Sequence, residues 1–142
     1  MTFEVAPDDP PKWSYVQRYP DWLKDKMSEK DHPYIPSGRE TWVGQVAEKD
    51  PISSEATCGL YWFRHGRDFL RAAHSMITKD IRTNGEFYLC PVYNEMIADG
   101  LTVGAWKVED HGATMHGLGT PEDLEKFLAH RHIAGRPDSH VA

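Results

Sequence analysis

The clearest hydrophobic pattern in the chain lies between Arg67 and Lys79. Apolar side chains recur there at the spacing of one helical face, namely Phe69, Ala72, Ala73, Met76 and Ile77. Residues at i, i+3, i+4, i+7 and i+8 meet on one side of an α-helix. The pattern therefore predicts an amphipathic helix over residues 67–79 that buries this stripe while Arg71, Ser75 and Lys79 face water.

Two more helices are indicated by their boundary residues. Pro91 suits the first turn of a helix that Gly100 ends. Its expected buried stripe is Val92, Tyr93, Met96 and Ile97. Thr120 is the expected N-cap of a last helix with Pro121 at its first position and acidic residues in its first turn. The expected buried face of that helix is Leu124, Phe127 and Leu128.

Extended segments alternate with these helices. They are Thr2–Val5, Lys12–Gln17, Thr41–Ala47, Cys58–Phe63 and Leu101–Val108. Aromatic residues fall on both faces of 61–63, which is typical of a strand covered on both sides. The strands and helices together predict an α/β fold with about three helices.

Two segments fall outside this pattern. Residues 18–38 are charged, carry prolines at 20, 33 and 36, and contain one plausible helix, Asp21–Glu29, with a thin apolar stripe. We interpret them as a surface insertion, with a lid over a site as the alternative. Residues 129–142 are predicted to be a flexible polar tail, and its His130-Arg-His132 run lacks the Cys or carboxylate that a metal site needs.

Composition narrows the class of protein. The 142 residues match about one soluble domain, and the net charge of −6 argues against a nucleic-acid-binding face. No apolar run approaches the roughly 20 residues needed to cross a membrane, and the N-terminus lacks a basic signal segment. We expect a cytoplasmic protein in which Cys58 and Cys90 are reduced, buried hydrophobes rather than a disulfide.

The candidate chemistry lies where a strand ends. Glu48 and Lys49 are followed by Asp50-Pro51, which forces a turn and leaves both charges near it. A carboxylate accepts hydrogen bonds from hydroxyls, and an ammonium is a compact charge for phosphate, so the pair could hold a sugar phosphate. Solvated surface charges are the alternative. Glu86, after the Asn84-Gly85 turn, would join them if the two segments are adjacent.

Five segments carry a resemblance to a known family. They are Lys12-Trp-Ser-Tyr15; Val46-Ala-Glu-Lys49 with Pro51-Ile-Ser53; Ala56-Thr-Cys-Gly-Leu-Tyr61; Asn84-Gly-Glu-Phe-Tyr88 with Pro91-Val-Tyr-Asn94; and Gly117-Leu-Gly-Thr-Pro-Glu-Asp-Leu124. In this order they resemble the C-terminal half of the sugar-phosphate nucleotidyltransferases, particularly the branch found in capsular-polysaccharide and lipopolysaccharide biosynthesis. The resemblance covers residues 1–128 except 18–38.

The resemblance implies a Rossmann-like α/β fold with a mixed sheet. It also implies the joining of a nucleoside triphosphate to a sugar 1-phosphate, with Mg²⁺ and release of pyrophosphate. Glu48 resembles the acid that binds sugar hydroxyls, and Lys49 resembles the base that neutralises the sugar phosphate. Gly59 resembles the glycine whose backbone approaches the sugar, and Glu86 resembles a second sugar-binding acid.

Two features depart from the family pattern. The family's glycine-rich loop, which binds the triphosphate, belongs upstream of any segment of this sequence. Where many relatives have a metal-binding Asp before the Gly-Thr turn, this sequence has His116-Gly117-Leu118. The chain therefore resembles the sugar-phosphate side of the enzyme without its nucleotide-binding half, and metal ligands are not evident in it.

Three hypotheses follow. The chain is a nucleotidyltransferase-like domain that needs a separately encoded N-terminal half for activity, a sugar-phosphate-binding or regulatory module without catalysis, or a truncated remnant that dimerises. The last rests on the exposed sheet edge and apolar surface that a missing half would leave.

Overall fold

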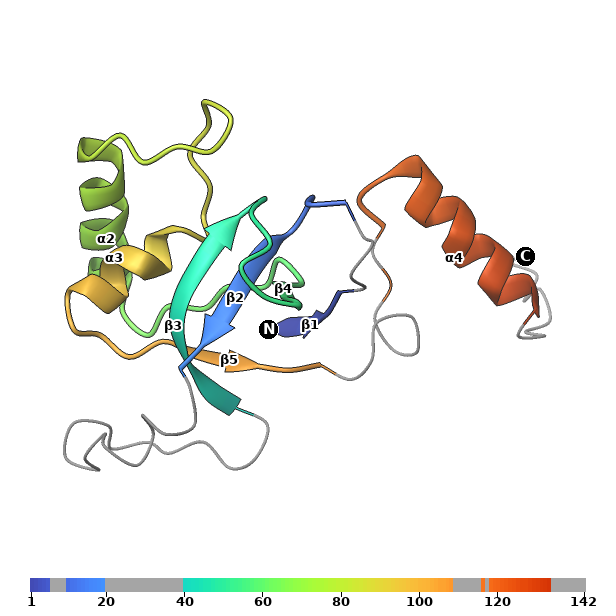
Figure 1. The fold of residues 1–142 in the computed structure, drawn as a ribbon, viewed down its shortest axis with the longest axis horizontal. Coiled ribbons are helices and arrows are strands. Elements are labelled where there is room, and N and C mark those ends of the chain that lie inside the picture. Colours follow the sequence, from blue (N-terminus) through green and yellow to red (C-terminus); the bar gives the residue numbers. More distant parts are fainter. Residues whose placement is uncertain (6–9, 20–39, 109–115, 117, 134–142) are drawn as a thin grey trace, which may run out of the picture. The chain divides into compact units, whose positions relative to one another are not determined.

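The computed structural model describes residues 1–5, 10–19, 40–108, 116 and 118–133 (Figure 1). The chain divides into two compact units, Met1–Val108 and Glu109–Ala142. No helix in the described ranges combines the length and the hydrophobicity that a membrane crossing requires. The predicted Asp21–Glu29 helix lies outside the described residues, as does nearly all of the predicted insertion.

A curled five-stranded sheet is the centre of the first unit (Figure 1). Its strands are β1 (Thr2–Glu4), β2 (Ser14–Arg18), β3 (Glu40–Glu48), β4 (Glu55–Thr57) and β5 (Gly104–Trp106), in the order β1-β4-β2-β3-β5. The two edge strands approach each other, because Thr2 forms an isolated bridge with Lys107 and its carbonyl accepts the Val108 N–H at 2.7 Å.

Every pairing between these five strands is antiparallel. The sequence analysis expected a mixed sheet, and the described part holds a parallel contact only at the Thr2–Lys107 bridge. Parallel neighbours need a long crossover connection, usually a helix. Here α2 and α3 both fall in the stretch between β4 and β5, which are not neighbours in the sheet.

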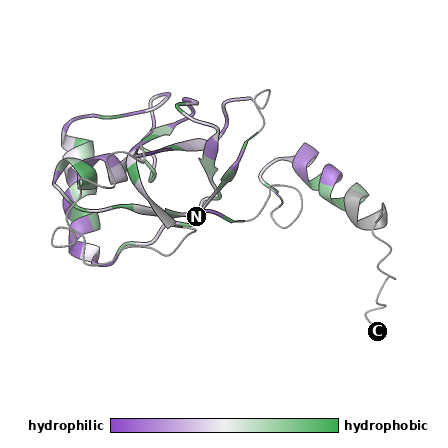
Figure 2. Cartoon of the chain, turned by 60° about the horizontal axis from the view of Figure 1, so that its bottom comes forward, coloured by the Kyte–Doolittle hydropathy of each residue, from purple (hydrophilic) through white to green (hydrophobic). Residues whose placement is uncertain are grey.

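Two helices pack together beside β3, as Figure 1 shows. They are α2 (Gly66–Thr78) and α3 (Val92–Ala98). Asn94 of α3 is bonded to the backbone of Val46, accepting its N–H at 2.9 Å and donating to its carbonyl at 2.8 Å. The amide thus satisfies the β3 backbone beyond the short stretch that pairs with β5. Figure 2 shows these helices with hydrophobic and hydrophilic residues on different sides.

The core of this unit lies between the sheet and the two helices. It consists of Val16, Val43, Val46, Ala72, Met76, Cys90, Val92, Met96, Val103 and Ala105. The helix predicted over 67–79 is confirmed, with Ala72 and Met76 buried and Phe69 and Ala73 partly buried against the core. Ile77 is wrong as a core residue, because 53% of it is exposed at the edge of the stripe. The Pro91 helix and its stripe are confirmed.

The prediction of a strand over Cys58–Phe63 is wrong, because the structure describes these residues and has no strand there. The ladder stops at Thr57, and Gly59 follows at a φ of +80°, a conformation that ends an extended run. Phe63 instead packs on the helices, 4.7 Å from the Phe69 ring and 4.9 Å from the Tyr93 ring. Trp62 is 76% exposed. The strand predicted over 101–108 is shorter than expected, covering Gly104–Trp106.

Both cysteines are free, as predicted, although Cys58 is half-buried and only Cys90 is fully buried. In the second unit, α4 (Pro121–Ile133) begins as predicted, since the Asp123 N–H donates to the Thr120 hydroxyl at 3.1 Å. Leu124 and Leu128, predicted as buried, are about half exposed. The helix covers the first five residues, 129–133, of the segment predicted to be a flexible tail. Residues 134–142 lie outside the described ranges.

Candidate functional site

The end of β3 places two charged residues beside a turn. Glu48 is the last residue of the strand, and Lys49 follows with a φ of +56°. This left-handed conformation is uncommon for a residue with a side chain and is found mainly where the surroundings impose it. The Lys49 N–H donates to the Trp13 carbonyl at 2.8 Å, which anchors the backbone of Lys49 to the start of β2.

A tight turn holds the second acidic residue. Thr83 and Glu86 exchange two backbone hydrogen bonds of 3.0 Å, and the residues between them, Asn84 and Gly85, have φ values of +50° and +81°. Two central residues with positive φ are the signature of a two-residue hairpin turn. The Arg82 guanidinium lies 3.9 Å from the centre of the Phe87 ring and donates to the Gly85 carbonyl at 2.9 Å. Glu86 therefore projects from a well-braced turn.

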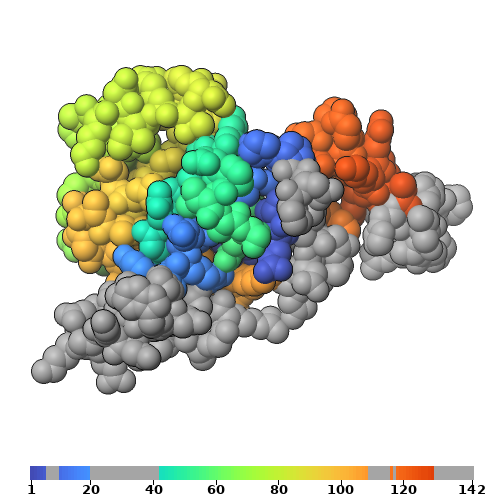
Figure 3. Space-filling view, in the orientation of Figure 1, coloured from blue at the N-terminus to red at the C-terminus, as the bar shows by residue number. Residues whose placement is uncertain are grey.

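Tyr88 connects these two segments. The Lys49 ammonium donates to the Tyr88 hydroxyl at 2.5 Å, and that hydroxyl donates to Glu86 Oε2 at 2.7 Å. We call this set of three residues the tyrosine bridge. Figure 3 shows the segment after β3 and the segment around residues 80–88 meeting on one face of the molecule. Sequence reasoning named Lys49 and Glu86 but not Tyr88, although Tyr88 lies within the quoted Asn84–Tyr88 motif.

The electrostatics of Lys49 reflect this arrangement. Its pKa is raised above all by the hydrogen bond to Tyr88, with smaller contributions from the charges of Glu48 and Glu86, while burial, the second-largest effect, opposes the rise. Both carboxylates are thus close enough to act on the ammonium. The structure therefore brings Glu48, Lys49 and Glu86 together in one charged cluster with a protonated lysine at its centre.

Glu48 is also tied to the interior. The Ser14 hydroxyl donates to Glu48 Oε2, and the two residues are partners in the β2–β3 ladder. The Tyr61 hydroxyl donates a hydrogen bond to Ser14 Oγ at 3.2 Å and forms another of 2.7 Å with the Thr57 hydroxyl. A row of hydroxyls therefore runs from the charged cluster toward the inside of the unit.

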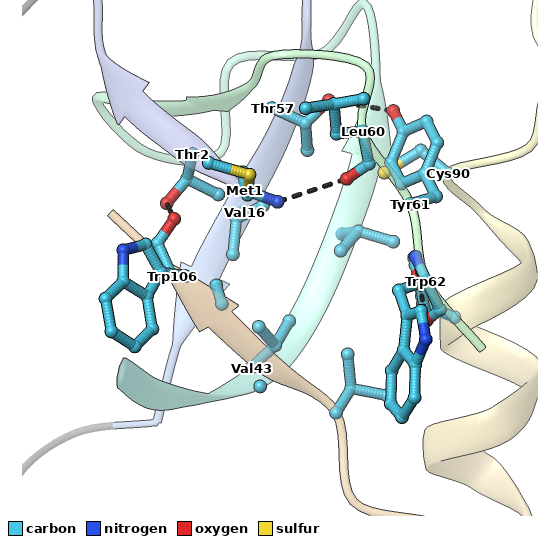
Figure 4. A pocket seen from close by; sticks show the side chains of 15 residues that line it. Met1, Thr2, Val16, Val43, Thr57, Leu60, Tyr61, Trp62, Cys90 and Trp106 are labelled. Atoms are coloured by element: carbon cyan, nitrogen blue, oxygen red, sulfur yellow. Dashed lines mark hydrogen bonds between the residues drawn. The ribbon is translucent and has the colours of Figure 1, made fainter. Parts of the chain in front are cut away.

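That row ends at an apolar cavity of about 350 Å³. The cavity is lined by strand residues such as Val16, Val43 and Val46, by the loop after β4, and by Cys90 and Tyr93 (Figure 4). In the view of Figure 4, Trp62 and Trp106 lie on opposite sides of it. Its volume falls in the range of ligand pockets, about 300–1,000 Å³.

The cavity wall carries polar groups that stay neutral. Burial raises the pKa of Tyr61 to about 12 and that of Cys90 to about 11. A thiol with so high a pKa is a poor nucleophile, because the thiolate is the reactive form. Tyr61 and Cys90 therefore stay neutral at pH 7, and neither is an ionised nucleophile.

Gly59 belongs to this loop rather than to the tyrosine bridge. Its φ of +80° and the open space where a Cβ would lie leave its backbone accessible. The next three residues, Leu60, Tyr61 and Trp62, all line the cavity. The structure thus joins Gly59 to the site through the cavity wall, while the other three predicted residues meet at the charged cluster.

A metal site was tested against the same residues. Within the described ranges, no three His, Cys, Asp or Glu side chains gather closely enough to hold a metal ion. Glu48 and Glu86 are engaged by Ser14 and Tyr88 respectively. These residues do not fit a Mg²⁺ site by themselves, so Mg²⁺ stays a prediction.

Comparison with known proteins bears on the chemistry of this cluster. No protein-family model and no curated protein matches the sequence. A comparison with solved structures gives a match. The chain is similar to a nucleoside-diphosphate-sugar pyrophosphorylase. That crystal structure, from Vibrio cholerae RC9, matches with a TM-score of 0.65 and 28% sequence identity.

The match with the pyrophosphorylase covers 90% of this chain but 44% of the other chain, so the sequence spans less than half of its neighbour's length. The similarity supports a relation to the sugar nucleotidyltransferases, as the motifs indicated. The finer assignments, to a C-terminal half and to the capsular branch, stay predictions.

Proposed function

We propose that this chain is a sugar-phosphate nucleotidyltransferase-like domain that supplies the sugar-phosphate side of the reaction. In that reaction a phosphate oxygen of a sugar 1-phosphate attacks the α-phosphorus of a nucleoside triphosphate, and pyrophosphate leaves. The observation that carries the proposal is the Lys49 ammonium linked through the Tyr88 hydroxyl to the Glu86 carboxylate, with Glu48 next to Lys49 at the end of β3. The similarity to the pyrophosphorylase supports the class of substrate.

Each residue has a role that its chemistry suits. Lys49 binds the sugar phosphate, because an ammonium has three donors and one of them is used by Tyr88. Glu48 and Glu86 accept hydrogen bonds from sugar hydroxyls, since a carboxylate has about four acceptor positions and the Ser14 and Tyr88 bonds use a fraction of them. Gly59 offers backbone groups to the sugar. Lys49 lowers the barrier by neutralising charge and positioning the attacking phosphate.

The chain is not proposed to be active alone. Its match leaves more than half of the pyrophosphorylase unmatched, and the described residues do not form a metal site. The second candidate is a sugar-phosphate-binding or regulatory module without catalysis. If the chain is the nucleotidyltransferase-like domain, a separately encoded N-terminal half binds the nucleoside triphosphate and Mg²⁺. The two halves would then form an enzyme of the branch found in capsular-polysaccharide and lipopolysaccharide biosynthesis.

Exposed apolar side chains support an association with another polypeptide. Met1, Leu60, Trp62 and Trp106 line the cavity, and between 43% and 76% of each is exposed. Clustered apolar surface of this kind marks protein interaction sites. The separately encoded half and a second copy of this chain are the two proposed occupants. Light scattering of the isolated chain distinguishes them, since self-association gives a dimer mass and dependence on a missing half gives a monomer.

Calorimetry with glucose 1-phosphate tests the substrate class. Lys49→Ala should weaken binding about 10- to 150-fold, because a hydrogen bond to a charged group contributes about 1.5–3 kcal/mol. Lys107→Ala is the matched control. Lys107 pairs with Glu4 at 2.8 Å and follows Trp106, which pairs with Glu40 at the opposite end of β3 from Lys49.

The outcomes separate the two candidates. Binding that depends on Lys49 but not on Lys107, without pyrophosphate release from a nucleoside triphosphate and Mg²⁺, supports the non-catalytic module. Pyrophosphate release on addition of the separately encoded half supports the enzyme. If the wild-type chain binds no sugar 1-phosphate, or if Lys49→Ala binds as well as wild type, the proposed function is wrong.

A further inference from the structure

The Tyr88 hydroxyl determines which group donates and which accepts each hydrogen bond of the tyrosine bridge. An ammonium can only donate hydrogen bonds, whereas a phenol has one proton and accepts as well. Lys49 must therefore donate to Tyr88, and the Tyr88 proton is directed to Glu86, at 2.5 and 2.7 Å respectively. Each bond has an ionised partner, the ammonium in one and the carboxylate in the other, and such charge-assisted bonds are stronger than neutral ones. The Lys49 ammonium also lies 4.6 Å from the centre of the Tyr88 ring.

The backbone on both sides of the bridge is held in place. Lys49 keeps its left-handed conformation through the bond to the Trp13 carbonyl, and Glu86 leaves a two-residue turn closed by a pair of hydrogen bonds. The two segments are 39 residues apart in sequence where Lys49 meets Tyr88. Tyr88 therefore spans two braced loops and fixes the separation between a cation and an anion.

We propose that Tyr88 is a positioning residue that holds the Lys49 ammonium and the Glu86 carboxylate at the separation required by a ligand bearing both a phosphate and a hydroxyl. This inference rests on the proposed function and names how that site recognises its substrate. Tyr88 itself acts through Lys49 and Glu86. The ligand meets the two remaining ammonium donors with its phosphate and the carboxylate with its hydroxyl.

Removing the Tyr88 hydroxyl removes both hydrogen bonds of the tyrosine bridge but leaves the ring in place. In Tyr88→Phe the ring stays, so its packing is retained. The lysine side chain regains its rotamer freedom, which it must lose again when a ligand binds. Glu86 loses its orienting donor as well. A ligand that bridges both groups suffers from both changes, while inorganic phosphate, which needs only Lys49, suffers from one.

The test compares two tyrosine variants of the full chain by calorimetry, with glucose 1-phosphate and inorganic phosphate as the probes. Tyr88→Phe should weaken inorganic phosphate binding by about threefold or less, because Lys49 regains its rotamer freedom, and glucose 1-phosphate binding by about tenfold, because the lost orientation of Glu86 adds to that effect. Tyr19→Phe is the control, because the Tyr19 ring lies beside Gly44 of β3 and belongs neither to the tyrosine bridge nor to the lining of the cavity.

A second readout reports the bridge directly. The ammonium protons of a hydrogen-bonded lysine exchange slowly enough to be seen by ¹⁵N NMR at low temperature. A Lys49 ammonium signal present in wild type and in Tyr19→Phe, and lost in Tyr88→Phe, supports the positioning role. This signal does not respond to a general loss of stability in a variant that circular dichroism shows to be folded.

The failures are distinguishable. If wild type binds glucose 1-phosphate and Tyr88→Phe binds it equally well, Tyr88 has no positioning role and the proposed function stands. If Tyr88→Phe weakens both probes by the same factor, Tyr88 acts on Lys49 alone and the two-group account is wrong. If wild type binds neither probe, the proposed function falls and the inference falls with it.

Discussion

Glu95 is a buried acid on which the packing of α2 against α3 depends. Only 9% of its side chain is exposed, and its Oε2 atom accepts two hydrogen bonds from α2, from the Ser75 hydroxyl at 2.5 Å and from the Lys79 ammonium at 2.7 Å. The sequence analysis assigned both Ser75 and Lys79 to the water-facing side of the helix. The substitution Glu95→Gln keeps the shape of the side chain and removes its charge.

The expected loss follows from the two contacts. A charge-assisted hydrogen bond is about twice as strong as a neutral one, so neutralising Glu95 removes about 1 kcal/mol from the Ser75 bond. Lys79 is 55% exposed, and an ion pair screened by water to this extent contributes about 0–1 kcal/mol. Glu95→Gln should therefore lower the free energy of unfolding by about 1–2 kcal/mol at pH 7.

The loss should depend on pH. The pKa of Glu95 is lowered below 4.5, chiefly by the hydrogen bond from Lys79 and then by that from Ser75. A depressed pKa in the folded state stabilises the protein above the unfolded pKa, and this contribution disappears as the pH falls through the folded value. The gap between wild type and Glu95→Gln should be widest near neutral pH and should close in acid, below 4.5.

Urea unfolding, followed by tryptophan fluorescence at pH 7 and at several acidic pH values, measures this gap. Asp99→Asn is the matched control, because Asp99 accepts a 3.0 Å bond from Arg71 at the end of the same helix but is 46% exposed. It should cost about 0–1 kcal/mol. A Glu95→Gln loss no larger than that of the control, or one that does not change with pH, would refute the reasoning.

Two further changes test the core and the turn. Met76→Ala empties a site that is 3% exposed and should lower the free energy of unfolding by about 2–5 kcal/mol, whereas Ile77→Ala, on the exposed edge of the same helix, should change it by less than about 1 kcal/mol. Equal losses in urea unfolding would mean that the helix faces are assigned wrongly. Gly85→Ala places a side chain at a φ of +81° and should cost about 1–2 kcal/mol, and calorimetry should show weaker glucose 1-phosphate binding because Glu86 is displaced. Unchanged glucose 1-phosphate binding would mean that the geometry of this turn does not affect the site.

The helices could be predicted because their signals are local. The apolar spacing of α2, Pro91 at the start of α3 and the Thr120 cap of α4 act within one or two turns of the chain. These signals mark where each helix begins and which face is apolar, although packing against the rest of the unit stabilises the helices. Burial depends on distant partners, which is why Ile77 was assigned wrongly to the core.

The strands were harder to predict because a strand is stabilised by a neighbour from elsewhere in the sequence. The aromatic run 61–63 fits a buried strand and a packed loop equally well as a pattern. Residues 61–63 form a packed loop because Gly59 has a positive φ, which ends the extended run, and because Phe63 packs on the helices. Likewise, β1 pairs with β4, more than fifty residues away, and nothing in either segment specifies that partner.

The residues read in order are enough to identify the types of chemistry present and the places where the chain turns. They include an acid and a base at the end of one strand and a second acid after an Asn-Gly turn. Folding brings these charges together, places a tyrosine hydroxyl between Lys49 and Glu86, and aligns a row of hydroxyls from Glu48 to an apolar cavity. The reason is physical: turns and helix caps are set by neighbouring residues, whereas a site is set by which distant segments pack together.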